Sequence, residues 1–337
     1  MKRKGNLFAK IVAMENIDKA FHNAAKGKHW QRQVKVAEEN KEALLVELQQ
    51  SLIGHTFHTS PYKTKWIYEP KKRLIFILPF YPDRIVQHAV MQILEPLWDK
   101  LMIHNSFACR KGKGQHKASD VCKKYAMKYE YCVQCDIRKF YPSIRHDLIK
   151  TLLRRKIKDK ELLWLLDDII DSAEGGKNVP IGNYLSQWLG NLFMNELDTY
   201  VKQELKVKAY LRYCDDFLFF GDDKEVLKDV ADKAEQFCND VLDLQLSKKS
   251  LFHTWQGVDF VGYRHFHSGK VLVRKRTAQR IMKKLKRLPD KLKHGRIGRE
   301  KARSVVASAK GWLQHANTYN LQQKLEMWRL KGMVAYA

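Results

Sequence analysis

The chain has few acidic side chains for its size and no long apolar run. Its 337 residues include 37 Asp and Glu against 63 Lys and Arg, which gives a formal net charge of +26. No stretch approaches the roughly 18 consecutive apolar residues of a membrane-spanning helix. The basic start, MKRKGNLFAK, lacks the apolar core of a secretory signal. These absences predict a cytoplasmic protein with no membrane partner.

The composition that remains is that of a globular protein with an unusual charge. Hydrophobic residues make up 45% of the chain and aromatic residues 11%, too much apolar material for a disordered chain. A surplus of 26 positive charges opposes compaction unless a polyanion shares the surface. The basic residues are spread along the whole chain, which favours nucleic acid over a membrane surface. The length predicts two or three structural units.

The placement of the cysteines argues against a metal or disulfide framework. A lysine-rich chain without an export signal is expected to keep its six cysteines reduced. Cys132 and Cys135 have the spacing of a zinc half-site, but no second pair of ligands stands at a familiar distance. Both lie in the apolar run YCVQC, so we interpret them as buried strand residues.

The hydrophobic pattern predicts a mixed α/β body followed by a basic helical appendage. Near residue 270 the composition changes, and residues 274–303 contain 14 Lys and Arg against two acidic residues. Asp83 is the expected N-cap of a helix. The elements expected from periodicity and from Gly and Pro breaks are helices over 17–52, 83–98, 183–201, 224–244 and 311–330, strands over 72–80 and from 131 into a turn, a Gly/Lys-rich loop over 110–118, two apolar runs within 209–223, and β structure over 257–266 and 270–275.

The strongest chemical signal is the pair Asp215–Asp216 between the apolar runs AYLRYC and FLFF. On a regular strand, neighbouring side chains point to opposite faces, whereas at a tight hairpin both carboxylates can approach one centre. Burying carboxylates between apolar strands costs free energy unless a cation binds them. Asp-Asp is also suited to an ordinary turn, and the pair alone does not separate these interpretations.

A second aspartate, Asp136, ends the apolar run CVQC in the same manner. A single Asp at a strand end is usually a cap or turn residue. Together with Asp215 and Asp216, however, it supplies the three carboxylates of a two-metal site. Two Mg²⁺ ions there would activate a 3′-hydroxyl and stabilise departing pyrophosphate. The nearby triplet Gly221-Asp222-Asp223 resembles an RNA polymerase signature, but capping the following helix is its simpler role.

At this point the motifs resemble those of a reverse transcriptase over roughly residues 65–335. The Tyr-x-Asp-Asp box is Tyr213–Asp216, and CDIRKFYPSI resembles the first catalytic box. The resemblance implies that Asp136, Asp215 and Asp216 are catalytic and bind two Mg²⁺ ions, replaceable by Mn²⁺ in vitro. Nucleotide-binding roles are implied by the motifs NSFACRKGKGQH, CDIRKFYPSI and LQLSKKS for Arg110, Tyr141 and Lys249, with Tyr141 rejecting a 2′-hydroxyl. RLIFILPF resembles the first fingers motif, and there Arg73 either contacts the triphosphate or is simply solvated.

A further box narrows the resemblance. Most reverse transcriptases have the box Gln-Gly-x-x-x-Ser-Pro before the long palm helix. Here the box is Ile181-Gly182-Asn183-Tyr184-Leu185-Ser186-Gln187, which is similar to the box in reverse transcriptases of diversity-generating retroelements. That group implies a bacterial or phage enzyme that copies a template-repeat RNA with errors opposite adenine. It also implies a small basic pentameric accessory protein. Ile181 and Gln187 then lie by the nucleotide pocket, where losing a polar contact loosens base-pair checking. On pattern alone, an ordinary core position beside Val179 and Leu185 is the favoured interpretation of Ile181, and the resemblance shifts it towards function.

The expected fold is therefore a right-hand α/β (α+β) polymerase with an antiparallel palm sheet. Residues 1–65 are expected to extend the fingers, 66–268 to form fingers and palm, and 269–337 to form a helical thumb on the template RNA and RNA/DNA hybrid. Its substrates would be dNTPs. The alternatives are a retron, abortive-infection or intron-type reverse transcriptase, a catalytically dead nucleic-acid-binding scaffold, and a generic basic RNA-binding protein.

Overall fold

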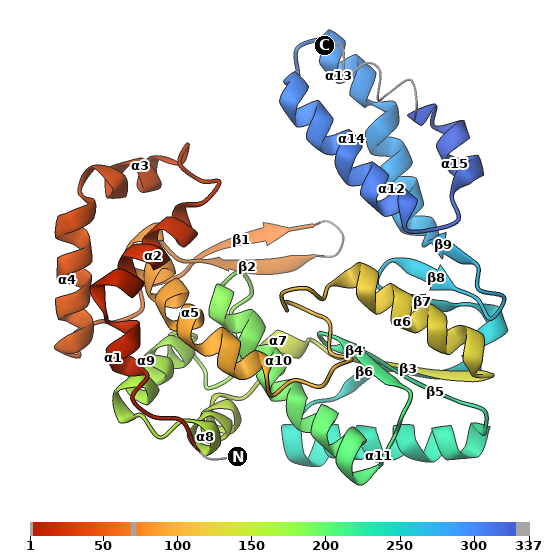
Figure 1. Cartoon of the computed structure of the whole chain (residues 1–337), viewed down its shortest axis with the longest axis horizontal. Coiled ribbons are helices and arrows are strands. Elements are labelled where there is room, and N and C mark those ends of the chain that lie inside the picture. Colours follow the sequence, from red (N-terminus) through yellow and green to blue (C-terminus); the bar gives the residue numbers. More distant parts are fainter. Residues whose placement is uncertain (1–2, 69–71, 328–337) are drawn as a thin grey trace. The chain divides into compact units, whose positions relative to one another are not determined.

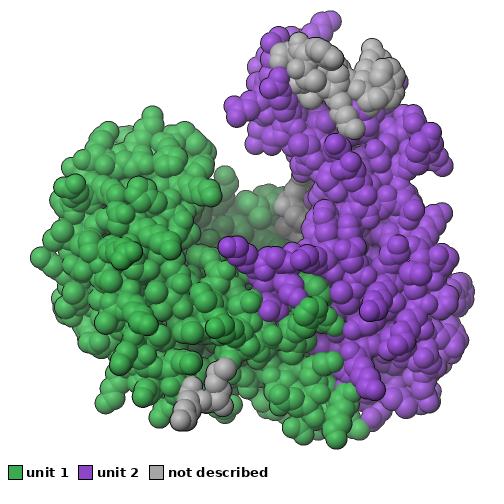
Figure 2. Space-filling model, in the orientation of Figure 1, with its two compact units in different colours: residues 1–109, 136–206, 232–248 green, residues 110–135, 207–231, 249–337 purple. Residues whose placement is uncertain are grey.

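The computed structural model describes residues 3–68 and 72–327, which fall into two compact units (Figure 2). Unit 1 comprises residues 1–109, 136–206 and 232–248, and unit 2 comprises 110–135, 207–231 and 249–337. Each unit combines three separate chain segments, so each unit is held together by contacts between residues far apart in the sequence. The domain limits expected at 65/66 and 268/269 stay a prediction.

Unit 1 begins with a group of helices where one helical pattern was expected over residues 17–52. The pattern is divided into separate helices, with Gly27 at φ +71° in one of the breaks. Leu45 and Leu48 are buried as the periodicity predicts, and Leu44 is half-buried. The helices are α1 (Phe8–Ile11), α2 (Met14–Ala25), α3 (Arg32–Glu39) and α4 (Lys41–Ile53), and α2 packs against α5 (Ile85–Asp99).

An antiparallel hairpin precedes α5. It consists of β1 (Lys63–Ile67) and β2 (Arg73–Ile77), the second matching the strand expected over 72–80. The prediction that Asp83 caps the following helix is wrong. Asp83 lies in the irregular turn η1 (Phe80–Arg84), is 1% exposed, and accepts a hydrogen bond of 2.9 Å from the backbone N–H of Ser60. The carboxylate of Asp83 is therefore bonded to Ser60, which is distant in sequence, in place of the start of the following helix.

The remainder of unit 1 is mainly helical. The long apolar helix expected over 183–201 is confirmed as α10 (Tyr184–Thr199), which is buried along most of its length and continues into the π-helical turn η2 (Tyr200–Glu204). The other helices are α7 (Phe140–Ser143), α8 (His146–Lys156), α9 (Lys160–Asp171) and the C-terminal part of α11 (Lys224–Leu242).

A four-stranded sheet has the strand order β4-β5-β3-β6 (Figure 1). Its strands are β4 (Tyr210–Tyr213), β5 (Asp216–Gly221), β3 (Tyr131–Ile137) and β6 (Leu246–His253), and helix α6 (Gln115–Lys128) packs against β4. Cys132 and Cys135 are buried free thiols of β3, as the strand interpretation predicts. β3 is apolar along most of its length because it is a central strand of the sheet.

The C-terminal part of unit 2 consists of a small sheet and a helical bundle. The strands β7 (Val258–Phe260), β8 (Tyr263–His265) and β9 (Val271–Val273) form an antiparallel meander. The bundle comprises α12 (Lys275–Lys286), α13 (Leu288–Lys293), α14 (Arg299–Gln314) and α15 (Tyr319–Lys324). The helix expected over 311–330 is broken between α14 and α15, and residues 328–330 lie outside the described residues.

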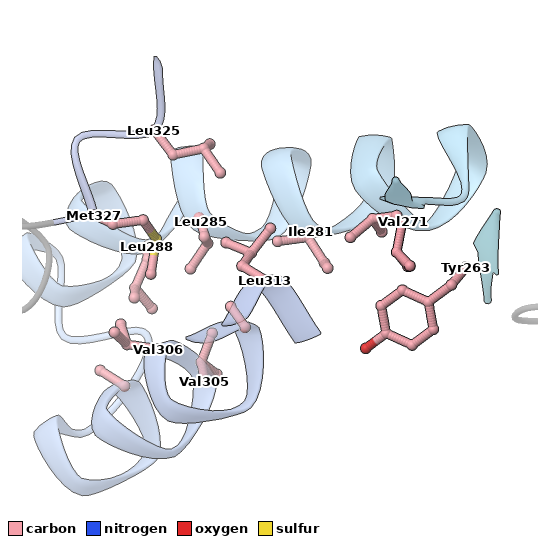
Figure 3. Packing of buried hydrophobic residues seen from close by; sticks show 13 residues of the cluster. Tyr263, Val271, Ile281, Leu285, Leu288, Val305, Val306, Leu313, Leu325 and Met327 are labelled. Atoms are coloured by element: carbon pink, nitrogen blue, oxygen red, sulfur yellow. The ribbon is translucent and has the colours of Figure 1, made fainter. Parts of the chain in front are cut away.

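The basic helical appendage therefore has an apolar core of its own. Ile281, Leu285 and Leu288 point towards Val305, Val306 and Leu313 of the neighbouring helix (Figure 3). The basic side chains of α12 lie on its exposed face. In the described part of the chain, none of the helices combines the length and apolarity needed to span a bilayer.

Candidate active site

The Asp215–Asp216 pair lies at a tight hairpin, as the sequence predicts. Tyr213 is paired with Asp216 across β4 and β5, so Cys214 and Asp215 form a two-residue loop. Cys214 has φ +60°, a conformation that such short hairpin loops require. Both carboxylates are half-buried. Because Asp215 and Asp216 lie at the turn, the alternation of side chains along a regular strand does not separate them, and both residues lie at the tip of the hairpin.

A buried arginine supports the hairpin. The side chain of Arg212 has 0% exposure, and its Nη1 donates a hydrogen bond of 2.9 Å to the backbone oxygen of Cys214. A buried guanidinium is tolerated only with hydrogen-bonding partners. The hydrogen bond ties the guanidinium to the backbone of the two-residue loop. Arg212 was not predicted from the sequence, although a lone arginine within the apolar run AYLRYC is a visible signal.

A buried amide fixes one of the two carboxylates. Gln134 of β3 donates from Nε2 to Oδ1 of Asp216 at 3.3 Å and to the backbone oxygen of Asp259 at 3.0 Å. It is therefore held between the hairpin and β7. Such a partner restricts the orientation of a carboxylate and tunes its affinity for a metal ion. Gln134 is a second residue of this site that was not predicted from the sequence, because no local pattern distinguishes it within the apolar run YCVQC.

Asp136 lies near the end of β3 and has its own anchor within unit 1. Its Oδ2 accepts a hydrogen bond of 2.8 Å from the hydroxyl of Ser247, at the start of β6. The backbone N–H of Arg138 donates to Gln245 at 2.8 Å, and Lys139 then turns the chain with φ +47°. The carboxylate is half-buried. The expected position at a strand end before a turn is confirmed.

The donor chemistry at these positions suits a hard divalent cation. Across residues 3–68 and 72–327, no group of three or more His, Cys, Asp or Glu side chains is already arranged to hold a metal ion. Mg²⁺ commonly binds one or two carboxylates and takes its remaining ligands from water and substrate phosphates. Asp215 and Asp216, both half-buried oxygen donors on one hairpin, fit that mode of binding.

The aromatic residue expected to select the sugar is fixed by close packing with α10. The ring of Tyr141 lies 5.1 Å from that of Phe140, centroid to centroid. A Cβ atom placed on Gly190 would come within 3.1 Å of both rings. The absence of a side chain at Gly190 therefore lets the helix approach Tyr141, which remains half-buried.

The box that contains Ile181 lies against the β1–β2 hairpin. The backbone N–H of Phe76 in β2 donates to the oxygen of Ile181 at 2.9 Å. Gly182 has φ +119°, and a Cβ atom there would lie 2.7 Å from the backbone oxygen of Phe76. Only glycine fits this approach. Ile181 is half-buried, Arg73 is exposed at the start of β2, and Gln187 is exposed on α10.

The two other expected nucleotide contacts belong to unit 2. Arg110 is half-buried in the loop that precedes α6, and Lys249 is exposed in β6.

The Gly221-Asp222-Asp223 triplet has a structural role. Oδ1 of Asp223 accepts hydrogen bonds from the backbone N–H groups of Glu225 and Val226 at 2.9 and 3.0 Å, which is N-capping of α11. Asp222 accepts from the backbone N–H of Glu130 at 3.0 Å. The prediction of a helix cap is confirmed.

Comparison with known proteins gives a family match over the same region. The model described as reverse transcriptase (RNA-dependent DNA polymerase) matches residues 63–265, more than half of the chain. That range contains the hairpin, Asp136, Tyr141 and the box at Ile181. The matched family and the antiparallel sheets with surrounding helices agree with the expected right-hand polymerase fold.

Similar curated proteins include Protein YkfC of Escherichia coli (strain K12), 25% identical over 304 residues, with 74% of this chain and 75% of that protein covered. Group II intron-encoded protein LtrA of Lactococcus lactis subsp. cremoris is 27% identical over 169 residues, with 47% of this chain and 28% of LtrA covered. A solved structure of apo telomerase from Candida tropicalis, truncated from its C-terminal domain, aligns with a TM-score of 0.47 at 14% identity and covers 67% of this chain and 59% of that one. The chain thus spans only part of LtrA and of the telomerase.

Proposed function

Because the chain belongs to the reverse transcriptase (RNA-dependent DNA polymerase) family, we propose that it extends a primer with deoxynucleotides on an RNA template. The observation that carries the proposal is the Cys214–Asp215 hairpin loop, with Asp216 tied to Gln134, inside the matched region. The reaction joins the primer 3′-oxygen to the α-phosphorus of a dNTP and releases pyrophosphate.

In this proposal Asp136, Asp215 and Asp216 hold two divalent ions, for which Mg²⁺ is the best chemical match. The bound ions would lower the pKa of the 3′-hydroxyl and neutralise charge on the phosphates. Gln134 orients Asp216, and Ser247 orients Asp136.

The remaining expected residues recognise the nucleotide. Tyr141 excludes a 2′-hydroxyl by packing against the sugar, and its fixed position against α10 supports that role. Arg73, Arg110 and Lys249 neutralise the triphosphate. Ile181 and Gln187 line the base-pair pocket. The partners are template RNA, the RNA/DNA hybrid and dNTPs, and a cytoplasmic location stays a prediction.

The finer proposal is a diversity-generating reverse transcriptase that misincorporates opposite adenine and works with a small basic pentameric accessory protein. The half-buried apolar side chain of Ile181, bonded through its backbone to β2, supports it, since an apolar residue there offers no polar check on the base pair. The second candidate is an intron-type reverse transcriptase, which the similarity to LtrA favours.

Sequencing the cDNA made from a defined RNA template separates these candidates. The diversity-generating proposal expects errors concentrated opposite adenine in the wild type and fewer such errors in Ile181→Gln. The control Ile181→Val keeps the side chain apolar and should retain the wild-type spectrum. Faithful cDNA from the wild type, also with template-repeat RNA and accessory protein present, would favour the intron-type candidate.

A further inference from the structure

The β1–β2 hairpin presents two chemically different faces. Trp66 is paired with Leu74 and Ile67 with Arg73, so strand alternation puts Trp66 and Arg73 on opposite faces. The Arg73 face includes Ile75, whose Cγ2 lies 3.1 Å from the Cβ position of Gly182. That face therefore adjoins the box proposed to line the nucleotide pocket, and the opposite face is left for another contact.

The opposite face carries two exposed aromatic rings and an ammonium group. Trp66 is 49% exposed and Tyr68 is 67% exposed. The Nζ atom of Lys72 lies 4.6 Å from the centroid of the Trp66 ring and 5.9 Å from that of Tyr68. Both distances lie within the range of cation–π attraction, so the three side chains form one cluster. Large aromatic rings held at a surface indicate a binding role.

The base of the hairpin is anchored, which makes this cluster a firm support. Phe76, on the same face, packs edge-on against Tyr62 with ring centroids 5.6 Å apart. The Tyr62 hydroxyl is hydrogen-bonded to the hydroxyl of Ser172 at 2.9 Å and accepts from Asn183 at 3.3 Å. Aromatic side chains on a fixed strand pair lose little conformational entropy when they bind a ligand.

The charge of the hairpin selects the kind of ligand. Neither β1, KTKWI, nor β2, RLIFI, contains an acidic residue. Lys72 is exposed on the Trp66 face, and Lys63 and Lys65 are exposed on the Arg73 face. Exposed aromatic rings interleaved with lysines are typical of surfaces that stack the bases of single-stranded nucleic acid and neutralise its phosphates. A protein partner would need acidic groups to match the same surface.

We propose that Trp66, Tyr68 and Lys72 form a stacking platform for the unpaired template strand. The rings stack on one or two bases, and Lys72 meets a flanking phosphate. The platform would hold the template single-stranded on one face of the hairpin while Arg73 serves the nucleotide on the other. This inference rests on the proposed function, since the ligand is the template of that reaction.

The test is fluorescence anisotropy with a labelled primer–RNA template duplex, either blunt or with a 5′ template overhang, in the absence of dNTPs. We expect Trp66→Ala to weaken overhang binding about tenfold, the effect of one lost stacked base, and to leave blunt-duplex binding unchanged. Trp66→Phe should keep most of the preference. Trp30→Ala, which removes a 75% exposed tryptophan elsewhere in unit 1, is the matched control.

An overhang of abasic sites provides a second arm, because it keeps the phosphates and removes the stacking partners. Wild-type protein should lose most of its overhang preference with that template. An equal loss for blunt and overhang duplexes, or unchanged overhang binding in Trp66→Ala, would overturn the platform. Binding is read without catalysis, so a protein that keeps the overhang preference but extends no primer would refute the polymerase proposal alone.

Discussion

At the scale of single residues, buried polar side chains support the hairpin that carries Asp215 and Asp216. Gln134 and Arg212 are both buried, and each donates to the hairpin at Cys214–Asp216. Leaving such groups unpaired costs free energy, so they persist only with defined partners. Their hydrogen bonds hold the Asp216 carboxylate and the backbone of the loop that carries Asp215.

Replacing Gln134 with leucine should therefore impair catalysis more than folding. The substitution keeps most of the volume and removes the amide that donates to Asp216. We expect activity about 10–100-fold lower and a higher Mg²⁺ concentration for half-maximal rate, as for other residues that orient metal ligands. The measurement is primer extension over a Mg²⁺ titration. Cys132→Ala, a buried change in the same strand, should leave the Mg²⁺ dependence unaltered.

A second residue-scale prediction concerns His265 of β8. Burial, the largest cause, lowers the pKa of His265 from 6.5 to about 4, and its ring is hydrogen-bonded to Ser119 at 2.7 Å. Because the folded pKa lies below the unfolded one, the unfolded chain binds more protons between these values. Stability is therefore complete above about pH 6.5 and falls towards pH 4, by about 1.4 kcal/mol per pH unit for this group.

Urea unfolding at pH 7.0, 6.0 and 5.0 measures this dependence. His265→Gln should be less stable at pH 7.0 and should show a shallower decrease with acid. His104→Gln, at an exposed position, serves as control. An equal slope in wild type and His265→Gln would contradict the assignment.

At the scale of secondary-structure elements, glycines govern how closely neighbouring segments approach. Gly182 and Gly176 both have positive φ, at +119° and +66°. Only Gly182 also faces backbone, since its Cβ position is 2.7 Å from Phe76 O, whereas that of Gly176 meets nothing within 4 Å. Substituting alanine at each glycine therefore distinguishes two effects. At Gly176 the substitution causes backbone strain alone, and at Gly182 it also displaces β2.

We expect Gly176→Ala to cost about 1 kcal/mol of stability through strain alone and to leave kinetics unchanged. Gly182→Ala should cost about 2–3 kcal/mol and raise the KM for dNTPs, because β2 must move away from the box at Ile181. Denaturant unfolding and steady-state extension measure both. Similar kinetics in the two variants would show that the β2 contact does not position the nucleotide site.

Local signals explain which parts of the fold could be predicted from sequence. The Asp215 hairpin and the Asp223 cap depend on neighbours within a few residues, and both were predicted. Asp83 was assigned wrongly because its partner, Ser60, lies 23 residues away. Gln134 and Ser247 were missed because their value comes from partners more than 80 residues distant, at Asp216 and Asp136. Sequence patterns predict elements, whereas contacts between elements require the tertiary structure.

At the scale of the whole molecule, the net charge of +26 predicts salt-sensitive binding to template and primer. The exposed face of α12 carries Lys283 and Lys284, over a helix pair with its own apolar core. The double change Lys283→Gln Lys284→Gln should reduce the slope of log affinity against log salt by about two. Anisotropy titrations at several salt concentrations test this, and an unaltered slope would remove α12 from the binding surface.

In the proposed reaction the hairpin aspartates, and not the neighbouring Asp222–Asp223 pair, carry the chemistry. Primer extension on a defined RNA template with Mg²⁺ and four dNTPs distinguishes the two pairs. Asp215→Asn Asp216→Asn should abolish extension. Asp222→Asn Asp223→Asn should retain it, because asparagine also caps a helix. Extension by the first variant, or its loss in the second with both proteins folded as shown by circular dichroism, would contradict the account.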